Sequence, residues 1–214
     1  MDTLSRHIAS GGQGWFYTCI SPQGRYLNRF IDQPLVKTRL LHWFNYRHNL
    51  AGFLHWGGNY WGPSPFENVQ RVINDNHTLL PAGDNAVVYP APATDSVLSS
   101  LRLEAMREGI EDYELLRALG VRDASRARAL AEKAIPHIND YVRNTAEFRK
   151  LERQLLEAFG ASIYVDWEDG EMPATTSTAT ATRLKSRIRE CNRFVLLASE
   201  RSKASLWVPW ELGY

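Results

Sequence analysis

The sequence contains little cysteine, and this excludes several kinds of site. Its 214 residues include two cysteines, Cys19 and Cys191, which lie far apart along the chain. Such a pair makes neither a disulfide framework nor a cluster of metal ligands. The histidines also lack the HExxH spacing of a helical zinc site. The sequence therefore predicts no metal site and no bound cofactor.

Long apolar runs and an excess of one charge are missing as well. No segment reaches the ~18–20 apolar residues that cross a bilayer, and residues 1–14 have no apolar core of the kind found in a signal peptide. The formal net charge is +1, so electrostatics does not favour nucleic acid or an anionic membrane as a partner. By default, these absences predict a cytoplasmic chain.

Aromatic residues, in contrast, are abundant. The chain has seven Trp and nine Tyr, and four of the Trp fall within the first 61 residues. Gly14–Ile20 and Gly52–Trp56 are short apolar segments typical of buried strands, and Pro34–Arg47 carries leucines at helical spacing. A strand, a helix and a strand over about forty residues predict a β-α-β unit, with parallel strands and a right-handed crossover.

A long loop and three helices are expected after this unit. Residues 57–92 are rich in Gly, Pro and Asn, with a short strand predicted at Ala86–Tyr89, and loops of this length usually serve a site. The first helix should begin near Ser99 or Ser100, with Glu104 at the spacing of a capping box, and should end at Gly120. The other two helices are predicted at residues 123–134 and 136–159.

The composition changes after Gly160, which predicts two domains, residues 1–160 and 161–214. The second part contains β-branched or apolar strand patterns at residues 162–166 and 193–198. Between them lie a Thr/Ala-rich loop and a basic helix predicted at residues 183–191. The two parts meet without a linker rich in Pro, Gly and Ser.

An ordered series of motifs runs through the first part. They are Trp15-Phe16-Tyr17-Thr18-Cys19, Asn28-Arg29-Phe30, residues 39–43 (RLLHW), residues 52–56 (GFLHW), Asn59-Tyr60-Trp61 and residues 100–114 (SLRLEAMREGIEDYE). In this order they resemble the C-terminal part of the catalytic domain of glycoside hydrolase family 123 and its relatives of unknown function. The resemblance covers about residues 14–160.

This resemblance implies an α/β fold in which the first part forms the last strands and helices of a (β/α)8 barrel. It also implies an exo-acting β-N-acetylgalactosaminidase in which the acetamide of the sugar itself attacks the anomeric carbon, a recognised exception to catalysis by two protein carboxylates. The family's adjacent Asp–Glu pair lies upstream of the matched region. We therefore expect a carbohydrate-binding portion that is inactive alone.

The acidic pair Glu111-Asp112 is a tempting substitute for the family's pair. It falls in the middle of a predicted helix, whereas barrel active sites are built from loops at the carboxyl ends of strands. With Arg102, Glu104 and Arg107 at helical spacings, the pair is better explained by ion pairs that brace the helix.

Four residues are candidates for contact with an N-acetylated sugar or glycan. Tyr17, Trp56, Asn59 and Trp61 lie at or just after the carboxyl ends of the predicted strands. Aromatic faces suit the C–H face of a pyranose, while a phenol or an amide bonds its polar groups. Core packing remains the alternative for each of them, and for Tyr17 the two interpretations are evenly balanced.

Other aromatic and imidazole groups near these strands are expected to be structural. Trp15 and Trp43 are predicted to lie in the core, and His42 to be a packing or surface residue of the helix. Strand alternation predicts that the side chain of His55 points away from that of Trp56.

The second part contains the motifs Tyr164-Val165-Asp166-Trp167, residues 193–199 (RFVLLAS) and residues 205–213 (SLWVPWELG). They resemble a bacterial TIR domain, which implies a flavodoxin-like parallel sheet and cleavage of NAD at the nicotinamide–ribose bond. Glu211 is the position that matches the catalytic glutamate of such enzymes. Other TIR domains only associate with one another, so the implied partners are NAD or a second TIR domain.

The TIR pattern is incomplete, because its first strand and its later strands have no match. Glu211 is equally well explained as a carboxylate at a helix start. Three hypotheses remain open: a sugar-binding portion of a glycosidase, a TIR-type module carried behind it, and a join that arose from gene prediction or a frameshift. The length of the first resemblance favours the first hypothesis.

Overall fold

The structure is a computed structural model that describes residues 2–67, 79–94, 96–161, 169–173 and 177–191. The chain divides into two compact units, Met1–Ala161 and Ser162–Tyr214. Both strands predicted in the second unit, and Glu211, lie outside the described residues.

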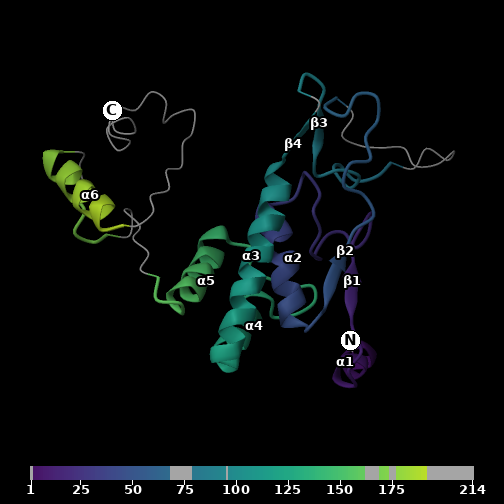
Figure 1. Cartoon of the computed structure of the whole chain (residues 1–214), viewed down its shortest axis with the longest axis horizontal. Coiled ribbons are helices and arrows are strands. Elements are labelled where there is room, and N and C mark those ends of the chain that lie inside the picture. The colour runs from purple at the N-terminus through teal and green to yellow at the C-terminus, as the bar shows by residue number, and fades with distance from the viewer. Residues whose placement is uncertain (1, 68–78, 95, 162–168, 174–176, 192–214) are drawn as a thin grey trace. The chain divides into compact units, whose positions relative to one another are not determined.

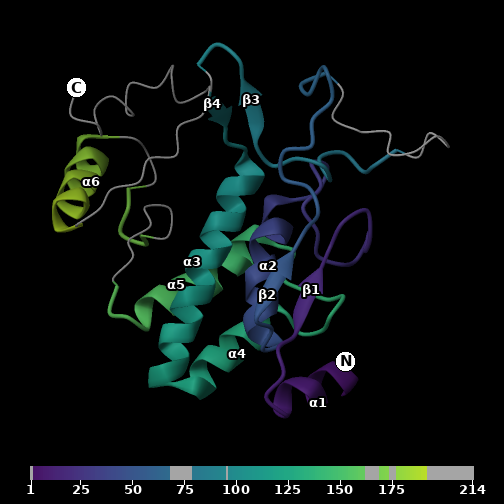
Figure 2. The same ribbon diagram turned by 45° about the vertical axis from the view of Figure 1, so that its right-hand side comes forward.

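The predicted β-α-β unit is present. β1 (Trp15–Tyr17) and β2 (Gly52–Leu54) pair in parallel, and α2 (Leu35–Arg47) connects them. The two strands lie side by side along one flank of α2 (Figures 1 and 2). Both strands are shorter than predicted, but the parallel pairing inferred from the sequence is confirmed.

The two faces of this small sheet differ. Phe16 and Phe53 pack against each other at a ring-centroid distance of 4.8 Å, and Phe16 lies 4.9 Å from Phe44 of α2. Trp15, on the other face, is 58% exposed, so the prediction that it lies in the core is wrong. Its strand partner is Gly52, whose missing side chain leaves room for the indole ring to lie across it instead of beneath α2.

Helices complete the first unit. α3 (Leu101–Arg122), α4 (Ala124–Ala134) and α5 (Thr145–Glu157) follow in order, and α2 lies between α3 and the small sheet (Figures 1 and 2). Burial of apolar surface between these helices stabilises the unit. The fully buried hydrophobic side chains include those of Leu40, Leu41, Trp43, Leu116 and Leu155. The core position predicted for Trp43 is therefore confirmed.

α3 extends past the glycine that was expected to end it. Gly120 lies within the helix, and a side chain there would meet the hydroxyl of Tyr46 at 2.5 Å. The glycine therefore permits a close helix contact and does not stop the helix. Ser100 caps α3 by accepting from the backbone N–H of Leu103, but Glu104 contacts Ser99 (2.6 Å) and does not complete a capping box.

The last helix of this unit is shorter than predicted. The sequence predicted one helix over residues 136–159, whereas α5 begins at Thr145. Asn144 provides the N-cap, because its side chain accepts from the backbone N–H groups of Ala146 and Glu147.

Three smaller elements remain. α1 (Asp2–Ala9) precedes β1, and β3 (Tyr89–Ala91) pairs with β4 (Ser96–Leu98) as an antiparallel hairpin. The strand predicted at residues 86–89 is displaced, since Ala86 forms an isolated bridge with Asn59. In the second unit, α6 (Thr178–Glu190) starts with a capping box at Ser177, earlier than predicted. The described fold is mixed α/β, mostly helical with small sheets.

Candidate functional site

The candidate site lies at the carboxyl ends of β1 and β2. These ends point toward the same end of the first unit as the β3–β4 hairpin and the start of α3 (Figures 1 and 2). Residues 18–31, 55–61 and 79–87 form the loops there. Carboxyl ends of parallel strands are where α/β enzymes place their functional side chains.

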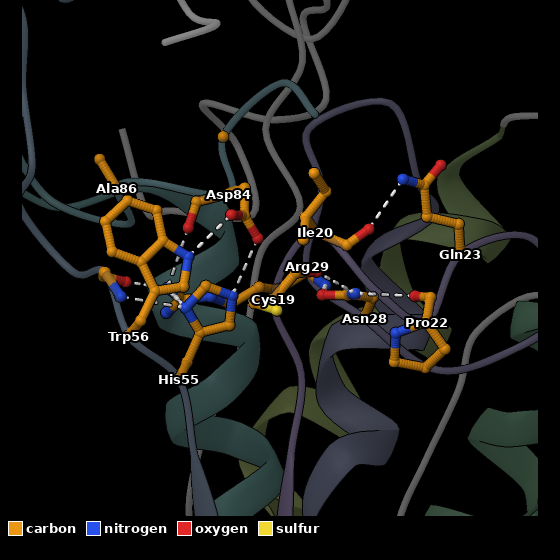
Figure 3. A network of polar contacts seen from close by, with 12 residues as sticks. Cys19, Ile20, Pro22, Gln23, Asn28, Arg29, His55, Trp56, Asp84 and Ala86 are labelled. Carbon is orange, nitrogen blue, oxygen red and sulfur yellow. Dashed lines mark hydrogen bonds and ion pairs between the residues drawn. The ribbon is translucent and has the colours of Figure 1, made fainter. Parts of the chain in front are cut away.

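Asp84 is the centre of the polar contacts at this end. Its side chain is fully buried, and each carboxylate oxygen faces a different aromatic residue. Oδ2 accepts from the indole Nε1–H of Trp56 at 2.8 Å, and Oδ1 lies 3.2 Å from Nε2 of His55 (Figure 3). The buried carboxylate therefore has one hydrogen bond, from Trp56, and one close polar contact, with His55, and such contacts matter because an unpaired charge away from water is costly.

The neighbours of His55 determine its tautomer. Its Nδ1 accepts from the backbone N–H of Gly57 at 3.2 Å and lies 2.5 Å from Nη2 of Arg29. Both neighbours are donors, so Nδ1 carries no proton and the proton of the neutral ring is on Nε2, which lies 3.2 Å from Oδ1 of Asp84 without the geometry of a hydrogen bond. Burial lowers the pKa of His55, the contact with Asp84 opposes this, and the charge of Arg29 adds to it. His55 is therefore a neutral donor at neutral pH.

The sequence-based expectation for His55 is thus wrong. Alternation was expected to turn it away from Trp56, but β2 ends at Leu54. Beyond the strand the backbone no longer alternates, and both side chains converge on Asp84 (Figure 3).

Arg29 joins the loops that follow the two strands. Its buried guanidinium donates to the carbonyl of Gly57, and Nη2 lies 3.4 Å from the carbonyl of Asp84. Burial, followed by repulsion from Arg102, lowers the pKa of Arg29 to about 10. The group therefore stays protonated at neutral pH and keeps its donors directed at the site.

Asn28 fixes the loop from which Arg29 extends. Its Nδ2 donates to the carbonyls of Cys19 (2.8 Å) and Pro22 (2.9 Å), and its Oδ1 accepts from the backbone N–H of Arg29 at 2.9 Å (Figure 3). These three bonds hold the segment after β1 against the base of Arg29.

Arg102 fixes the third loop from α3. Nη1 donates to the carbonyls of Arg29 (2.8 Å) and Gly83 (2.7 Å), and Nη2 donates to the carbonyl of Ala86 (2.5 Å). Gly83 has a φ of +76°, which favours glycine, and an added Cβ would lie 2.6 Å from Nη1 of Arg102. Arg102 therefore holds the loop that carries Asp84, and does not brace Asp112 as the sequence suggested.

Two of the four sugar-binding candidates lie beside this centre. Trp56 is 41% exposed and its indole N–H is already used by Asp84, so its ring faces remain available. Tyr17 is 47% exposed, with its ring centroid 6.4 Å from that of His55. Desolvation, followed by the hydrogen bond with Cys19, raises the pKa of Tyr17, so its phenol remains a donor.

The other two candidates lie farther along the same loop. The side chain of Asn59 is exposed, while its backbone bridges to Ala86. Trp61 is half-buried and donates its indole N–H to the carbonyl of Val88 at 2.8 Å. Tyr60 packs edge-on against Trp56 with centroids 5.5 Å apart, which adds an exposed aromatic group that sequence reasoning had not selected.

Asp84 and Arg29 were also missed as site residues. The available signal for Asp84 was its place in Gly83-Asp84-Asn85, a polar triplet within the loop whose length already suggested a site. Arg29 lies in the motif Asn28-Arg29-Phe30, but no pattern in the sequence assigns it a partner.

Asp112 of the acidic pair in α3 has the structural role expected for it, with a different basic partner. Asp112 is buried and accepts from Arg39 of α2 at 2.7 and 2.9 Å and from Nε1 of Trp43 at 2.8 Å. Arg39 also lies 3.1 Å from Glu108 and 2.8 Å from Glu152. Through Arg39, Asp112 therefore connects three helices, α2, α3 and α5.

Comparison with known proteins agrees with this arrangement. Residues 1–119, more than half of the chain, match the sequence model described as glycoside hydrolase 123, catalytic domain. The chain belongs to this family.

This family 123 chain also resembles a solved structure. That structure is a family 123 glycoside hydrolase from Clostridium perfringens, studied for glycolipid glycan hydrolysis, with a TM-score of 0.52 and 22% sequence identity. The match covers 74% of this chain but 29% of the clostridial one. At this identity the likeness shows the fold.

The C-terminal part resembles a different protein. Over 64 residues the chain is 42% identical to a protein of Bacillus cereus named as a probable 3′ cyclic ADP-D-ribose synthase, ThsB'. The match covers 29% of this chain and 33% of the bacillar protein. The family 123 chain therefore continues into a TIR-like segment.

Within the described ranges, no group of three or more His, Cys, Asp and Glu side chains has an arrangement that could hold a metal ion. In the same residues, no helix has the length and apolar character needed to cross a membrane.

Proposed function

We propose that residues 1–161 form a carbohydrate-binding C-terminal portion of a family 123-like β-N-acetylgalactosaminidase, corresponding to the last strands and helices of a (β/α)8 barrel. Its ligand is an N-acetylated sugar or glycan. The observation that carries the proposal is Trp56, whose exposed ring lies at the end of a parallel strand with its N–H fixed on the buried Asp84.

The chemistry of the surrounding groups supports a sugar. An indole whose N–H is already bonded offers its flat faces, which suit the C–H face of a pyranose. Tyr17 and Asn59 are exposed and supply a phenol and an amide for hydroxyl or acetamide groups. Trp61 has its N–H bonded to Val88 and supplies only ring surface.

The proposed role is binding and not turnover. The sequence contains no Asp followed directly by Glu, the pair that the family resemblance implies for catalysis. The reversed pair Glu111-Asp112 is unsuitable, because Asp112 is buried and already bonded to Arg39 and Trp43. We therefore expect no hydrolysis of aryl N-acetyl-β-galactosaminides by this chain, and turnover that disappears in Glu111→Gln would contradict this proposal.

Thermal unfolding of the whole chain with and without N-acetylgalactosamine tests the binding role. Sugar at ten times its Kd should stabilise the folded state by about 1.4 kcal/mol and raise the midpoint by roughly 3–6 °C. Trp56→Ala should abolish this increase. Trp15→Ala is the matched control, because Trp15 is also an exposed Trp but lies at the amino end of β1, away from the site. If both variants respond as the wild type does, the site is not at Trp56.

A second candidate function is favoured by the similarity to the Bacillus cereus protein. In this proposal the C-terminal part is a TIR-type module that cleaves NAD, with Glu211 as catalytic glutamate, or that associates with another TIR domain. Release of nicotinamide from NAD by the whole chain, lost in Glu211→Ala, would support cleavage. No release, together with a concentration-dependent mass in solution, would favour association.

A further inference from the structure

We propose that Asp84 is a positioning residue, which holds the ring of Trp56 in the orientation that a sugar meets. This inference rests on the proposed function, since it assigns the control of that same site. Asp84 is fully buried and does not itself reach the surface. Its effect on a ligand must therefore pass through Trp56, which is 41% exposed.

Each carboxylate oxygen of Asp84 contacts a different ring. Oδ2 accepts from the indole N–H of Trp56 at 2.8 Å, and Oδ1 lies 3.2 Å from Nε2 of His55, a close contact without hydrogen-bond geometry. The rings of His55 and Trp56 lie nearly parallel, at an interplanar angle of 22°. A Trp side chain has two rotatable bonds, and a hydrogen bond to the N–H of its ring restricts both of them.

A carboxylate is required here because both neighbours are donors. His55 cannot move its proton to Nδ1, since the backbone N–H of Gly57 and the guanidinium of Arg29 already point at that atom. Asn at position 84 would keep one acceptor oxygen and direct an NH2 group at the other donor. Asp84→Asn therefore keeps the size of the side chain but releases either His55 or Trp56.

Two arginine side chains also hold the residues around Asp84 in place. Arg29 lies on His55, Gly57 and the backbone of Asp84, and Arg102 holds the carbonyl of Gly83 just before Asp84. The position of the indole thus depends on three loops and α3, and not on its own loop alone. A ring fixed before the ligand arrives loses less conformational entropy on binding.

The first experiment needs no sugar. In a 15N–1H correlation spectrum the indole N–H groups of the seven Trp residues give separate signals, and Trp56→Phe identifies the signal of Trp56 by its loss. We expect Asp84→Asn to shift this signal and to increase its exchange with water. An unchanged Trp56 signal in both folded Asp84→Asn and folded Asp84→Ala would overturn the proposal, because the Ala variant keeps no side-chain acceptor for the indole N–H.

The second experiment is a double-mutant cycle on the affinity for N-acetylgalactosamine. Asp84→Asn should weaken binding about tenfold, and Trp56→Phe, which keeps a flat ring but removes the N–H, by a similar factor. If Asp84 acts through the indole, the double variant should bind as Trp56→Phe does. Independent, multiplying effects would overturn the proposal.

Controls separate this inference from folding and from the proposed function. Asp112→Asn changes the other buried aspartate that accepts from an indole, and it should lower the midpoint of unfolding without changing sugar affinity. If Asp84→Asn does not fold, Trp56→Phe alone decides, because wild-type affinity in that variant would overturn the positioning role. If the wild type does not bind the sugar, the proposed function fails, while the indole spectrum still tests the contact.

Discussion

Two buried aspartates in this chain use the same contact in different regions. Asp112 accepts the indole N–H of Trp43 at 2.8 Å, and Asp84 accepts that of Trp56 at the same distance. Trp43 is fully buried among the helices, whereas Trp56 is 41% exposed at the end of β2. The hydrogen bond is equivalent, but one indole fills the core and the other is offered to solvent.

The remaining partners explain the difference. Asp112 is paired with the guanidinium of Arg39, whose pKa burial lowers but the contacts to Asp112 and Glu152 raise more strongly. This ion pair connects α2 with α3 and α5. Asp84 instead faces the neutral His55, and its contacts connect loops. The comparison indicates that the first aspartate serves stability, and that the second serves the shape of the site.

The largest effect is expected for Asp112→Ala. Removing this carboxylate leaves the partly buried guanidinium of Arg39 and the buried N–H of Trp43 without the acceptor that they share. Loss of one partner from a buried pair destabilises by about 3–5 kcal/mol, to be measured by denaturant unfolding. Sugar affinity of the folded fraction should not change. A loss of less than about 1 kcal/mol, or a selective loss of affinity, would break the distinction between the two aspartates.

The replacement of Trp56 by Ala should affect sugar binding more than stability. Because the ring is partly exposed, we expect its removal to cost less stability than Asp112→Ala while abolishing the thermal shift caused by sugar. Measuring both variants in both assays shows whether each aspartate–tryptophan pair affects stability or sugar affinity.

The sequence indicates local structure well and distant partners poorly. The parallel β-α-β unit followed from periodicity within about forty residues, and Ser100 followed from capping preferences. Trp56 and Asp84, in contrast, are 28 residues apart, and Arg39 and Asp112 are 73 apart. No local pattern pairs such residues, because the contact depends on how the loops and helices pack.

The errors have the same origin. Trp15 looked like a core residue because it is large and apolar, but its position opposite Gly52 leaves the ring outside. Gly120 looked like a helix stop, yet it permits the approach of Tyr46. In both cases a neighbour distant in sequence decides the outcome, and tertiary packing overrides local preference.

A smaller effect, on acid stability, should separate the imidazoles of the two regions. His42 of α2 has a buried Nε2 with no hydrogen-bond partner in the described residues, and burial lowers its pKa to about 4. His55, in the site, has Asp84 beside its Nε2. Protonation of His42 in the folded state is therefore opposed without any nearby carboxylate to compensate.

The sign of this effect follows from linkage. An unfolded chain binds a proton at His42 near pH 6.5, while the folded chain does so only near pH 4. As the pH falls from 6.5 toward 4, the unfolded state gains protons that the folded state lacks, so stability is lost across this window. Because the ring is partly accessible to solvent, we expect a loss of about 1–2 kcal/mol from this residue.

His42→Phe should remove that part of the pH dependence, since a phenyl ring preserves the edge-on packing against Phe53 but does not titrate. Free energies of unfolding measured at pH 7, 6, 5 and 4 for the wild type and the variant give the difference directly. His137→Gln, which replaces an exposed imidazole outside the helical core, serves as the control for the loss of a histidine. If His42→Phe keeps the wild-type slope, acid sensitivity does not arise in the helical core, and the Asp84–His55 contact becomes the place to look for it.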